Sequence, residues 1–278
     1  MTAPAPAKKT ASPSGPRRPQ SARARLSVIV LTKDSADTLG ACLASLAFAD
    51  QVIVIDSGSR DASLAIARAF GATIRSQAWK GYTAQRNFGL RQCKHPWVLS
   101  VDSDEVVTPE LAQDILGVLA APLEGAPKAY QIPEKLRFFR RWLRHGGIYP
   151  GYHVTLFQRA HARYGHGPAD VHEGVQVAGP LGRLNGFKLH HAYPSFGLAL
   201  SKLNRYTSLE AQGRWDHGVR PSVYGLFWRP LERFLKNYFL KLGFLDGLEG
   251  FLYCYLTAHY SFVIHVKLYE LQRMGRVA

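Results

Sequence analysis

Two aspartates one residue apart stand in the first half of the chain, directly after a short apolar run. Residues 98–101 predict a buried strand, and Asp102, Ser103 and Asp104 follow it. Buried carboxylates are costly unless they pair with cations or bind a metal. Mg²⁺ and Mn²⁺ prefer such oxygen ligands and also bind diphosphates, so the pattern suits a metal-assisted diphosphate site. At this point an acidic turn that begins the next helix explains the two aspartates equally well.

The same polar pattern follows two other predicted strands. Residues 26–31 and 51–55 are rich in β-branched and apolar residues, and helical periodicity follows each of them. Alternating strands and helices predict an α/β fold with a parallel, doubly wound sheet, in which ligands bind beyond the carboxyl ends of the strands. The polar residues at these two ends are Thr32, Lys33, Asp56, Ser57 and Gly58. The sequence lacks Gly-x-Gly-x-x-Gly and a Walker loop, which disfavours a dehydrogenase or a P-loop enzyme.

The composition predicts a folded, strongly basic protein. The chain has 278 residues, 46% of them hydrophobic, and a formal net charge of +15, so it can form a large core and favours a polyanionic partner. The three cysteines lack metal-ligand spacing and predict reduced thiols. Residues 1–25 are basic and contain no acid, which predicts a disordered tail and not a secretory signal.

Several longer motifs resemble those of family 2 glycosyltransferases, which have the GT-A fold. The resemblance lies in Lys33 and in residues 54–61, 80–87 and 97–105. Four later segments are similar to the lipopolysaccharide-core glycosyltransferases of the WaaE type, namely residues 144–150, 171–173, 202–206 and 243–247. Together the resemblance covers about residues 26–274. The chain departs from the family at Lys33-Asp34-Ser35, where Lys-Asn-Glu is usual, so no role carries over to Ser35.

The resemblance implies that a sugar is transferred, with inversion, from a nucleotide diphosphate. A UDP-sugar is the expected donor and a divalent metal, Mg²⁺ or Mn²⁺, the expected cofactor. The resemblance places Asp104 on the metal, Asp102 near both metal and ribose, and Asp56 on the base ring. The residues expected to bind the nucleotide-sugar are Thr32, Lys33, Asp56, Ser57, Gly58, Lys80, Gln85, Arg86, Asn87, Asp102 and Ser103. A solvated helix face explains Arg86 equally well.

Transfer to a hydroxyl also needs a general base. The resemblance places an acid after the sheet, so Glu173 is the expected base and Asp170 the second candidate. A structural salt bridge explains Glu173 almost as well. His190 follows a strand-like run at residues 187–189, and the resemblance favours it as a metal ligand beside Asp104 and Asp102. A hydrogen bond within the core is the competing interpretation of His190.

The last part of the chain is expected to form helices near a membrane. Residues 227–240 show helical periodicity with cations opposite an apolar face. Residues 251–266 are apolar but shorter than the roughly 20 residues that span a bilayer. Residues 135–144 interleave cations with aromatic side chains, as in a membrane-interface segment, a surface for single-stranded nucleic acid, or an amphipathic helix packed on the sheet.

The expected organisation has three parts: a disordered basic tail (1–25), a GT-A domain with a mostly parallel, Rossmann-like sheet (26–192), and a helical, membrane-proximal extension (193–278). The expected acceptor is a lipid-linked saccharide of the lipopolysaccharide core or a related envelope glycan, reached from an anionic membrane surface. This implies a peripheral protein on the cytoplasmic face of the inner membrane of a Gram-negative-type bacterium.

Two other functions compete with this one. A polyprenyl-phosphate glycosyltransferase shares the fold, but it more commonly has unmistakable spanning helices. A nucleic-acid-binding module explains the positive charge but not the acids at the strand ends, which would repel phosphates. No nucleic-acid partner is therefore expected.

Overall fold

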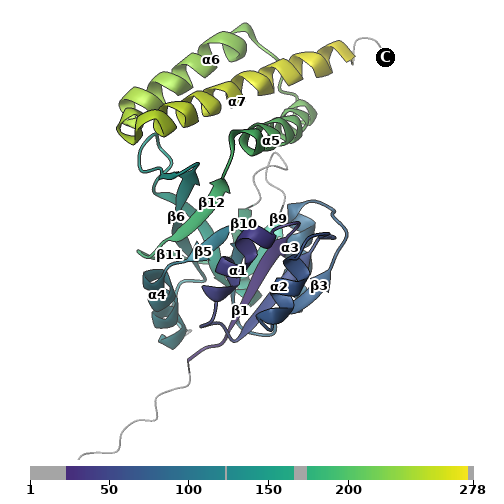
Figure 1. Cartoon of the computed structure of the whole chain (residues 1–278), viewed down its shortest axis with the longest axis vertical. Coiled ribbons are helices and arrows are strands. Elements are labelled where there is room, and N and C mark those ends of the chain that lie inside the picture. Colours follow the sequence, from purple (N-terminus) through teal and green to yellow (C-terminus); the bar gives the residue numbers. More distant parts are fainter. Residues whose placement is uncertain (1–22, 123, 166–173, 275–278) are drawn as a thin grey trace, which may run out of the picture.

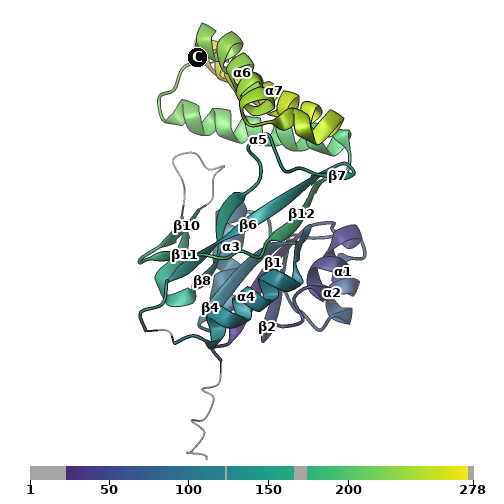
Figure 2. The same ribbon diagram turned by 90° about the vertical axis from the view of Figure 1, so that its left-hand side faces the viewer.

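The structure is a computed structural model that describes residues 23–122, 124–165 and 174–274. Within these residues, ten strands form one mixed sheet in the order β3-β2-β1-β4-β8-β6-β12-β5, with β7 and β11 paired to β6 (Figures 1 and 2). β9 and β10 form a separate pair. The strands are β1 Leu26–Thr32, β2 Gln51–Asp56, β3 Thr73–Ser76, β4 Trp97–Asp102, β5 Glu105–Val107, β6 Ala129–Phe138, β7 Arg141–Trp142, β8 Gly151–Gln158, β9 Ala162–Gly165, β10 Gly174–Val177, β11 Leu181–Arg183 and β12 Lys188–Tyr193.

Helices flank the sheet and form a separate layer at one end of the molecule (Figure 1). They are α1 Ala36–Ala44, α2 Ser63–Ala69, α3 Tyr82–Gln92, α4 Pro109–Ala120, α5 Phe196–Asp216, α6 Val223–Leu235 and α7 Gly247–Met274. Short 3₁₀ turns lie at Arg159–His161 and Gly243–Asp246, and a π-helical segment, Lys236–Leu240, continues α6. The layer made of α5, α6 and α7 packs on the sheet through a cluster around Phe138, Leu203 and Leu256.

The parallel half of the sheet is buried on both faces. β1, β2, β3 and β4 run parallel, with β1 between β2 and β4. Val28 and Val30 belong to one apolar cluster and Ile29 to another, because successive side chains of a strand point to opposite faces. This places the carboxyl ends of β1, β2 and β4 at one edge, as the sequence predicts.

The other half of the sheet contains both parallel and antiparallel strand pairs. β8 is antiparallel to both β4 and β6, β12 is parallel to β6, and β5 is antiparallel to β12. β5 lies only two residues after β4, yet it pairs at the far edge of the sheet. The pairing of β5 with β12 brings the acidic stretch after β4 against β12.

Two helices that follow strands of the sheet begin at hydroxyl residues. Thr108 caps α4: its hydroxyl accepts a hydrogen bond from the Leu111 amide at 3.3 Å, with Pro109 at the first helical position. The first helix, α1, begins at Ala36, and its N-cap residue is Ser35.

Residues 135–144 do not form an amphipathic helix. They form the last part of β6, a turn and β7, since Phe138 and Leu143 are buried in the sheet-to-helix interface. Within β6, Lys135 and Arg137 alternate with Leu136 and Phe138, which is the period of a strand and not of a helix. Arg23 and Ala24, placed in the basic tail by the sequence, are held by Asp50 at 2.8 Å and by the Leu119 carbonyl at 2.8 Å.

The apolar stretch at residues 251–266 lies inside the much longer helix α7. Within residues 23–122, 124–165 and 174–274, none of the helices combines the length and the hydropathy that a bilayer crossing requires.

Candidate active site

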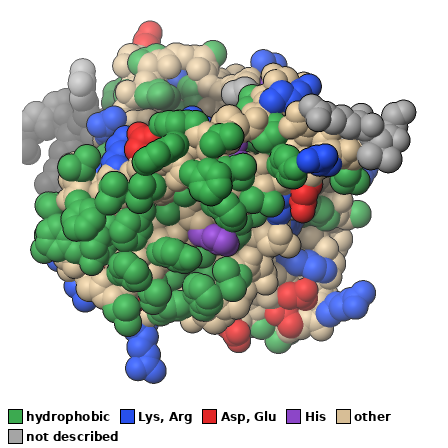
Figure 3. Space-filling model, turned by 90° about the horizontal axis from the view of Figure 1, so that it is seen from above, with side chains coloured by type: hydrophobic (Ala, Val, Ile, Leu, Met, Phe, Trp, Pro, Cys, Tyr) green, Lys and Arg blue, Asp and Glu red, His purple; other side chains and the backbone are tan. Residues whose placement is uncertain are grey.

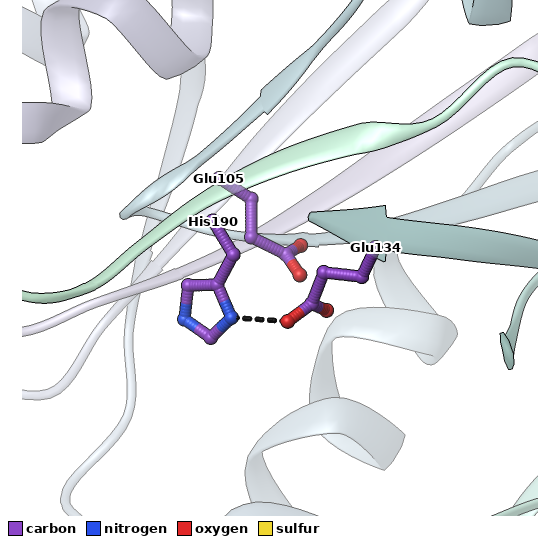
Figure 4. Close-up of side chains that lie close together, drawn as sticks. All are labelled: Glu105, Glu134 and His190. Carbon is purple, nitrogen blue, oxygen red and sulfur yellow. Dashed lines mark hydrogen bonds and ion pairs between the residues drawn. The ribbon is translucent and has the colours of Figure 1, made fainter. Parts of the chain in front are cut away.

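Strand register brings three titratable side chains together beyond β4. His190 of β12 stands opposite Glu105 of β5, and Lys188 of β12 stands opposite Glu134 of β6. Lys188 and His190 are two residues apart and so share one face of the strand. Ligand atoms of Glu105, Glu134 and His190 all lie within 4.8 Å of one another (Figure 4).

His190 lies between two carboxylates. Its Nδ1 is 2.5 Å from Oε1 of Glu134, and its Nε2 is 3.4 Å from Oδ2 of Asp104. Burial lowers the pKa of His190, but Asp104 and Glu134 outweigh burial and raise it well above the ordinary value. Burial likewise raises the pKa of Glu134 and of Asp104, and the imidazole outweighs it, so the pKa of Glu134 falls to about 2 and that of Asp104 falls further. The three groups are therefore charged together at neutral pH.

Two lysines complete the charge balance of this cluster. Lys202 of α5 is 3.6 Å from Asp104 and donates to the Ala192 carbonyl at 3.0 Å. Lys188 is 2.5 Å from Glu105, with both side chains at most 4% exposed. Burial, helped by the charges of Asp102 and Glu134, raises the pKa of Glu105 to about 7 against the opposing effect of Lys188.

The donor set suits a divalent cation. Asp104, His190 and Glu134 present carboxylate oxygens and imidazole nitrogens from three different elements, which are the atoms that Mg²⁺ and Mn²⁺ accept. A metal on His190 would displace its proton. His190 does not follow its strand, as the sequence suggested, but lies within β12, which continues to Tyr193.

Asp102 faces Arg86 of α3. The guanidinium donates to Asp102 at 2.9 and 3.3 Å and to the Ser100 hydroxyl at 2.6 Å. The amide of Asp102 also donates to Glu105 at 2.8 Å, which fixes the turn between β4 and β5. Arg86 is thus turned toward the predicted site and away from the solvated helix face that competed with this role. A share of Asp102 in metal binding stays a prediction.

The turn after β2 forms a compact loop beside the end of β1. Gly58 and Ser59 donate their amides to the Asp56 carboxylate at 2.9 and 3.1 Å, and Ser57 donates to the Thr32 carbonyl at 3.1 Å. The Lys33 ammonium donates to the Gly58 carbonyl. Gly58 has φ 87°, a conformation that glycine adopts readily.

The polar groups around this loop differ in their exposure. Asp56 is 2% exposed, so its carboxylate closes the turn, and contact with a base ring stays a prediction. Thr32 is also buried, and its hydroxyl has no hydrogen-bond partner among the described residues. Ser103 donates to the Ser35 hydroxyl at 2.9 Å, which links the turn after β4 to the start of α1.

Two residues predicted to bind the nucleotide form hydrogen bonds within the protein. Gln85 is fully buried, and its amide donates to the Ser57 hydroxyl and to the Gln77 carbonyl at 3.0 and 2.9 Å. Asn87 exchanges two hydrogen bonds with the Tyr164 backbone at 2.9 and 3.2 Å and so holds β9. Direct contact of either side chain with a nucleotide stays a prediction. Lys80 is exposed on the loop before α3.

The predicted bases Glu173 and Asp170 lie outside the described residues. Within the described part, Glu134, Lys188 and Lys202 were missed as site residues by the sequence reading. Glu105 was noticed only as the end of a motif. Glu134 and Lys188 show no local pattern, because a cross-strand pairing between residues over fifty positions apart creates their contact.

The comparisons with known proteins define the class of this molecule. The model of the glycosyl transferase family 2 matches residues 27–168, and the chain belongs to this family. It is thus a glycosyltransferase with a GT-A-like α/β fold and a helical C-terminal region.

More particular relatives are bacterial glycosyltransferases. The lipopolysaccharide core biosynthesis glycosyltransferase LpsC of Rhizobium meliloti is 31% identical over 261 residues, which cover 88% of this chain and 92% of LpsC. An uncharacterized glycosyltransferase of Rickettsia bellii is 28% identical over 257 residues, 89% of this chain and 87% of its own. These matches extend through the helical region as well as the sheet.

Solved structures show more distant similarity. The mannosyltransferase PcManGT of Pyrobaculum calidifontis, in complex with GDP-Man and Mn²⁺, has a TM-score of 0.49 and 13% identity over 93% of this chain and 81% of its own. S. aureus TarS 1-349 in complex with UDP-GlcNAc has a TM-score of 0.46 and 15% identity over 90% and 92% of the two chains.

Proposed function

We propose that this protein is an inverting, metal-dependent glycosyltransferase that moves a sugar from a nucleotide diphosphate, most simply a UDP-sugar, to a lipopolysaccharide-core or related envelope saccharide. The observation that carries the proposal is the Asp104–His190–Glu134 array beyond β4, at the sheet edge where the strand-end loops meet. The similarity to LpsC over nearly the whole chain supports the acceptor class.

The residues of the array have separate tasks in this proposal. Asp104 and His190, with Asp102 beside them, would hold the divalent ion. When bound, such an ion neutralises the charge that develops on a departing diphosphate. Glu134 holds the His190 ring from its other nitrogen, and this orients the ligand nitrogen toward Asp104. We assign to Arg86 the binding of donor oxygens, which its hydrogen bond to Asp102 supports.

Sugar transfer requires two events: the diphosphate must leave, and the acceptor hydroxyl must lose its proton. We assign that step to Glu173, with Asp170 as the alternative base, on the resemblance described above. Both residues precede β10, which pairs with β9 and so is tied through Asn87 to α3. The inversion follows from a single displacement at the anomeric carbon.

A membrane surface is the proposed location of the acceptor. α6 carries six apolar side chains that are between 44% and 71% exposed: Val223, Tyr224, Phe227, Trp228, Leu231 and Leu235. Seen from this end of the molecule, hydrophobic side chains cover much of the surface (Figure 3). A patch of this kind marks an interaction surface. The net charge of +15 favours the anionic cytoplasmic leaflet of a bacterial inner membrane as its occupant.

Calorimetric titration of the full chain with UDP, with and without Mn²⁺, tests the site. We expect binding that depends on the metal and that Asp104→Asn lowers at least tenfold, because the variant loses a charged ligand. Glu124→Gln, which removes a charge from the exposed loop after α4, is the control and should bind as the wild type does. Equal UDP affinity in Asp104→Asn and wild type would contradict the assignment of Asp104 as a metal ligand.

A further inference from the structure

A second hollow lies outside the carboxylate site, among the helices of the C-terminal layer. It is an open cavity of about 650 Å³, lined by α5, α6, α7, the π-helical segment and the loop at residues 146–148. None of the described residues assigned to the transfer reaction lines it. Its lining combines apolar side chains from α5 and α7 with a row of cations from α6 and the π-helical segment.

The cations of this row are not paired with carboxylates of the described residues. Arg229, Arg233, Lys236 and Lys241 line the cavity and are exposed, and none forms a salt bridge with any described residue. The hydroxyl of Ser261 accepts a hydrogen bond from Arg233 at 2.9 Å, so this contact leaves the charge uncompensated. Water screens these exposed charges in part, but four cations around one hollow still favour the binding of an anion.

Two charged groups nearby are already neutralised or engaged. Arg214, a fifth lining cation, is 2.5 Å from Glu210 on the same helix. Glu232, which also lines the cavity, accepts a hydrogen bond from the Tyr224 hydroxyl at 2.9 Å. The cavity therefore keeps an excess of positive charge.

An unpartnered buried group is a second, independent sign of a ligand. His265 of α7 lines the cavity and is 4% exposed, yet neither ring nitrogen has a hydrogen-bond partner among the described residues. An unpaired buried polar group costs about 1–3 kcal/mol, which a bound polar molecule recovers. The ring sits against Gly225 of α6, where any side chain would collide with it.

The cavity leads toward the carboxylate site. A smaller hollow of about 210 Å³ is lined by Glu134 and His153 and shares Gly147, Ile148 and Tyr253 with the larger cavity. Glu134 is the residue that holds His190. A molecule seated among the helices could therefore extend toward Asp104.

We propose that the helical cavity binds the phosphate or carboxylate group of an anionic acceptor saccharide and holds that acceptor for transfer at the carboxylate site. The proposal rests on the glycosyltransferase function given above. The orientation of α6 supports this proposal. Its apolar side chains are exposed to solvent, while Arg229, Arg233 and Glu232 line the cavity. The lipid portion of an acceptor would then lie on the apolar face and its anionic sugar beneath it.

The test follows the imidazole resonances of the full chain by NMR, with His265 identified by its loss in His265→Gln. Glucose 6-phosphate and glucuronic acid should shift the His265 resonance, and glucose at the same concentration should not. The double variant Arg233→Gln/Lys236→Gln should weaken this binding at least tenfold. The matched control, Arg68→Gln/Lys94→Gln, removes two exposed cations from the sheet domain and should leave it unchanged.

Three outcomes would overturn the proposal: equal shifts with glucose, unchanged affinity in the cavity variant, or shifts with phosphatidylglycerol vesicles and not with the sugar anions. UDP and Mn²⁺ binding, measured on the same samples, separates this inference from the proposed function. A wild type that binds UDP but no sugar anion overturns the inference alone. A wild type that binds the sugar anions but no nucleotide overturns the acceptor role together with the proposed function.

Discussion

A histidine between two carboxylates sets the chemistry of the candidate active site at the scale of single residues. Asp104 and Glu134 stabilise a charged His190, while Lys188 and Lys202 balance the remaining negative charge. Such an array is preorganised: the ligand atoms stay at short distances because buried ion pairs and strand register hold them.

Lys188 provides a sensitive test of this arrangement. Lys188→Met leaves Glu105 buried without its cation and should lower the free energy of unfolding by about 3–5 kcal/mol at alkaline pH, where Glu105 is charged. With Lys188 present the pKa of Glu105 is already about 7, and removal of the cation raises it further, so the loss should shrink as the pH falls toward neutral and Glu105 takes up a proton. Urea unfolding at several pH values measures both effects.

The double variant Lys188→Met/Glu105→Gln is the control for that experiment. The neutral amide that replaces the carboxylate has no charge to compensate and can still accept the hydrogen bond from the Asp102 amide, so part of the stability should return. A single variant as stable as wild type would show that Lys188 and Glu105 do not depend on each other.

Some residues of the candidate active site have a local sequence pattern and others do not. Asp102, Asp104 and Arg86 could be named from the sequence because they follow or precede a strand in a recognisable local order, and their role in binding stays a prediction. Glu134 escaped because its contact with His190 is made across two strands that are distant in sequence. Glu105 and Lys188 escaped as a pair for the same reason, since strand pairing and not local spacing joins them.

At the scale of elements, the packing of α3 against the sheet depends on a glycine. A Cβ at Gly89 would lie 2.7 Å from Ile29 and 3.2 Å from Ile55, both in buried strands. The close approach of α3 brings Arg86 to Asp102 and Asn87 to β9. The helical periodicity of this segment could be predicted, but its depth against the sheet could not.

Gly89→Ala should therefore lower the free energy of unfolding by about 1–3 kcal/mol through overpacking. Gly117→Ala in α4 is the matched control, because nothing lies within 4 Å of the added Cβ. There the better helix propensity of alanine should raise stability by up to about 1 kcal/mol. Thermal unfolding of both variants measures the opposite signs, and equal effects would contradict the packing account.

A single buried carboxylate, Asp246, joins the 3₁₀ turn before α7 to the loop after β7. Asp246 accepts the amides of Arg144 and His145 at 2.8 and 2.7 Å and contacts the His145 ring at 3.1 Å. Burial raises the pKa of Asp246, but the two amides and His145 outweigh it and hold the pKa below its ordinary value.

This carboxylate should make the layer sensitive to acid. Because the folded pKa is lower than the unfolded value of about 3.9, the stabilisation is complete above that value and is lost as the pH falls through the folded pKa. Asp246→Asn should be less stable than wild type at pH 7, and the difference should narrow toward pH 3. Urea unfolding across this range measures the difference, and a gap that widens in acid would contradict the prediction.

At the scale of the whole molecule, the sheet and the helical layer carry different kinds of surface. The sheet edge carries the acids and the helical layer carries an exposed apolar face above a cationic cavity. The sequence predicted the parallel strands and the late helices, because both have strong local periodicity. It mistook residues 135–144 for a separate surface segment, since the partner strands that bury them lie elsewhere in the chain.

The apolar face leads to a prediction about binding to membranes. Replacing Phe227 and Leu231 with serine should lower co-sedimentation with phosphatidylglycerol vesicles at least tenfold, because both side chains are exposed on the outer side of α6. Phe70→Ser, at the exposed end of α2, is the control and should sediment as wild type does. Unchanged vesicle binding, with a dimer in analytical ultracentrifugation that the two serines abolish, would assign this face to a second copy of the chain.

β12 connects the two ends of the molecule. It holds His190 in its middle, reaches Tyr193 and passes into α5 after a capping serine at 195, without a long linker. A protein docked through α6 would thus keep its transfer site at one fixed height above the lipid. Glycans whose reactive hydroxyl stands nearer to the bilayer, or farther from it, would be out of reach. The fixed distance between α6 and the transfer site would then select acceptors by the number of sugars between the lipid and the reactive hydroxyl.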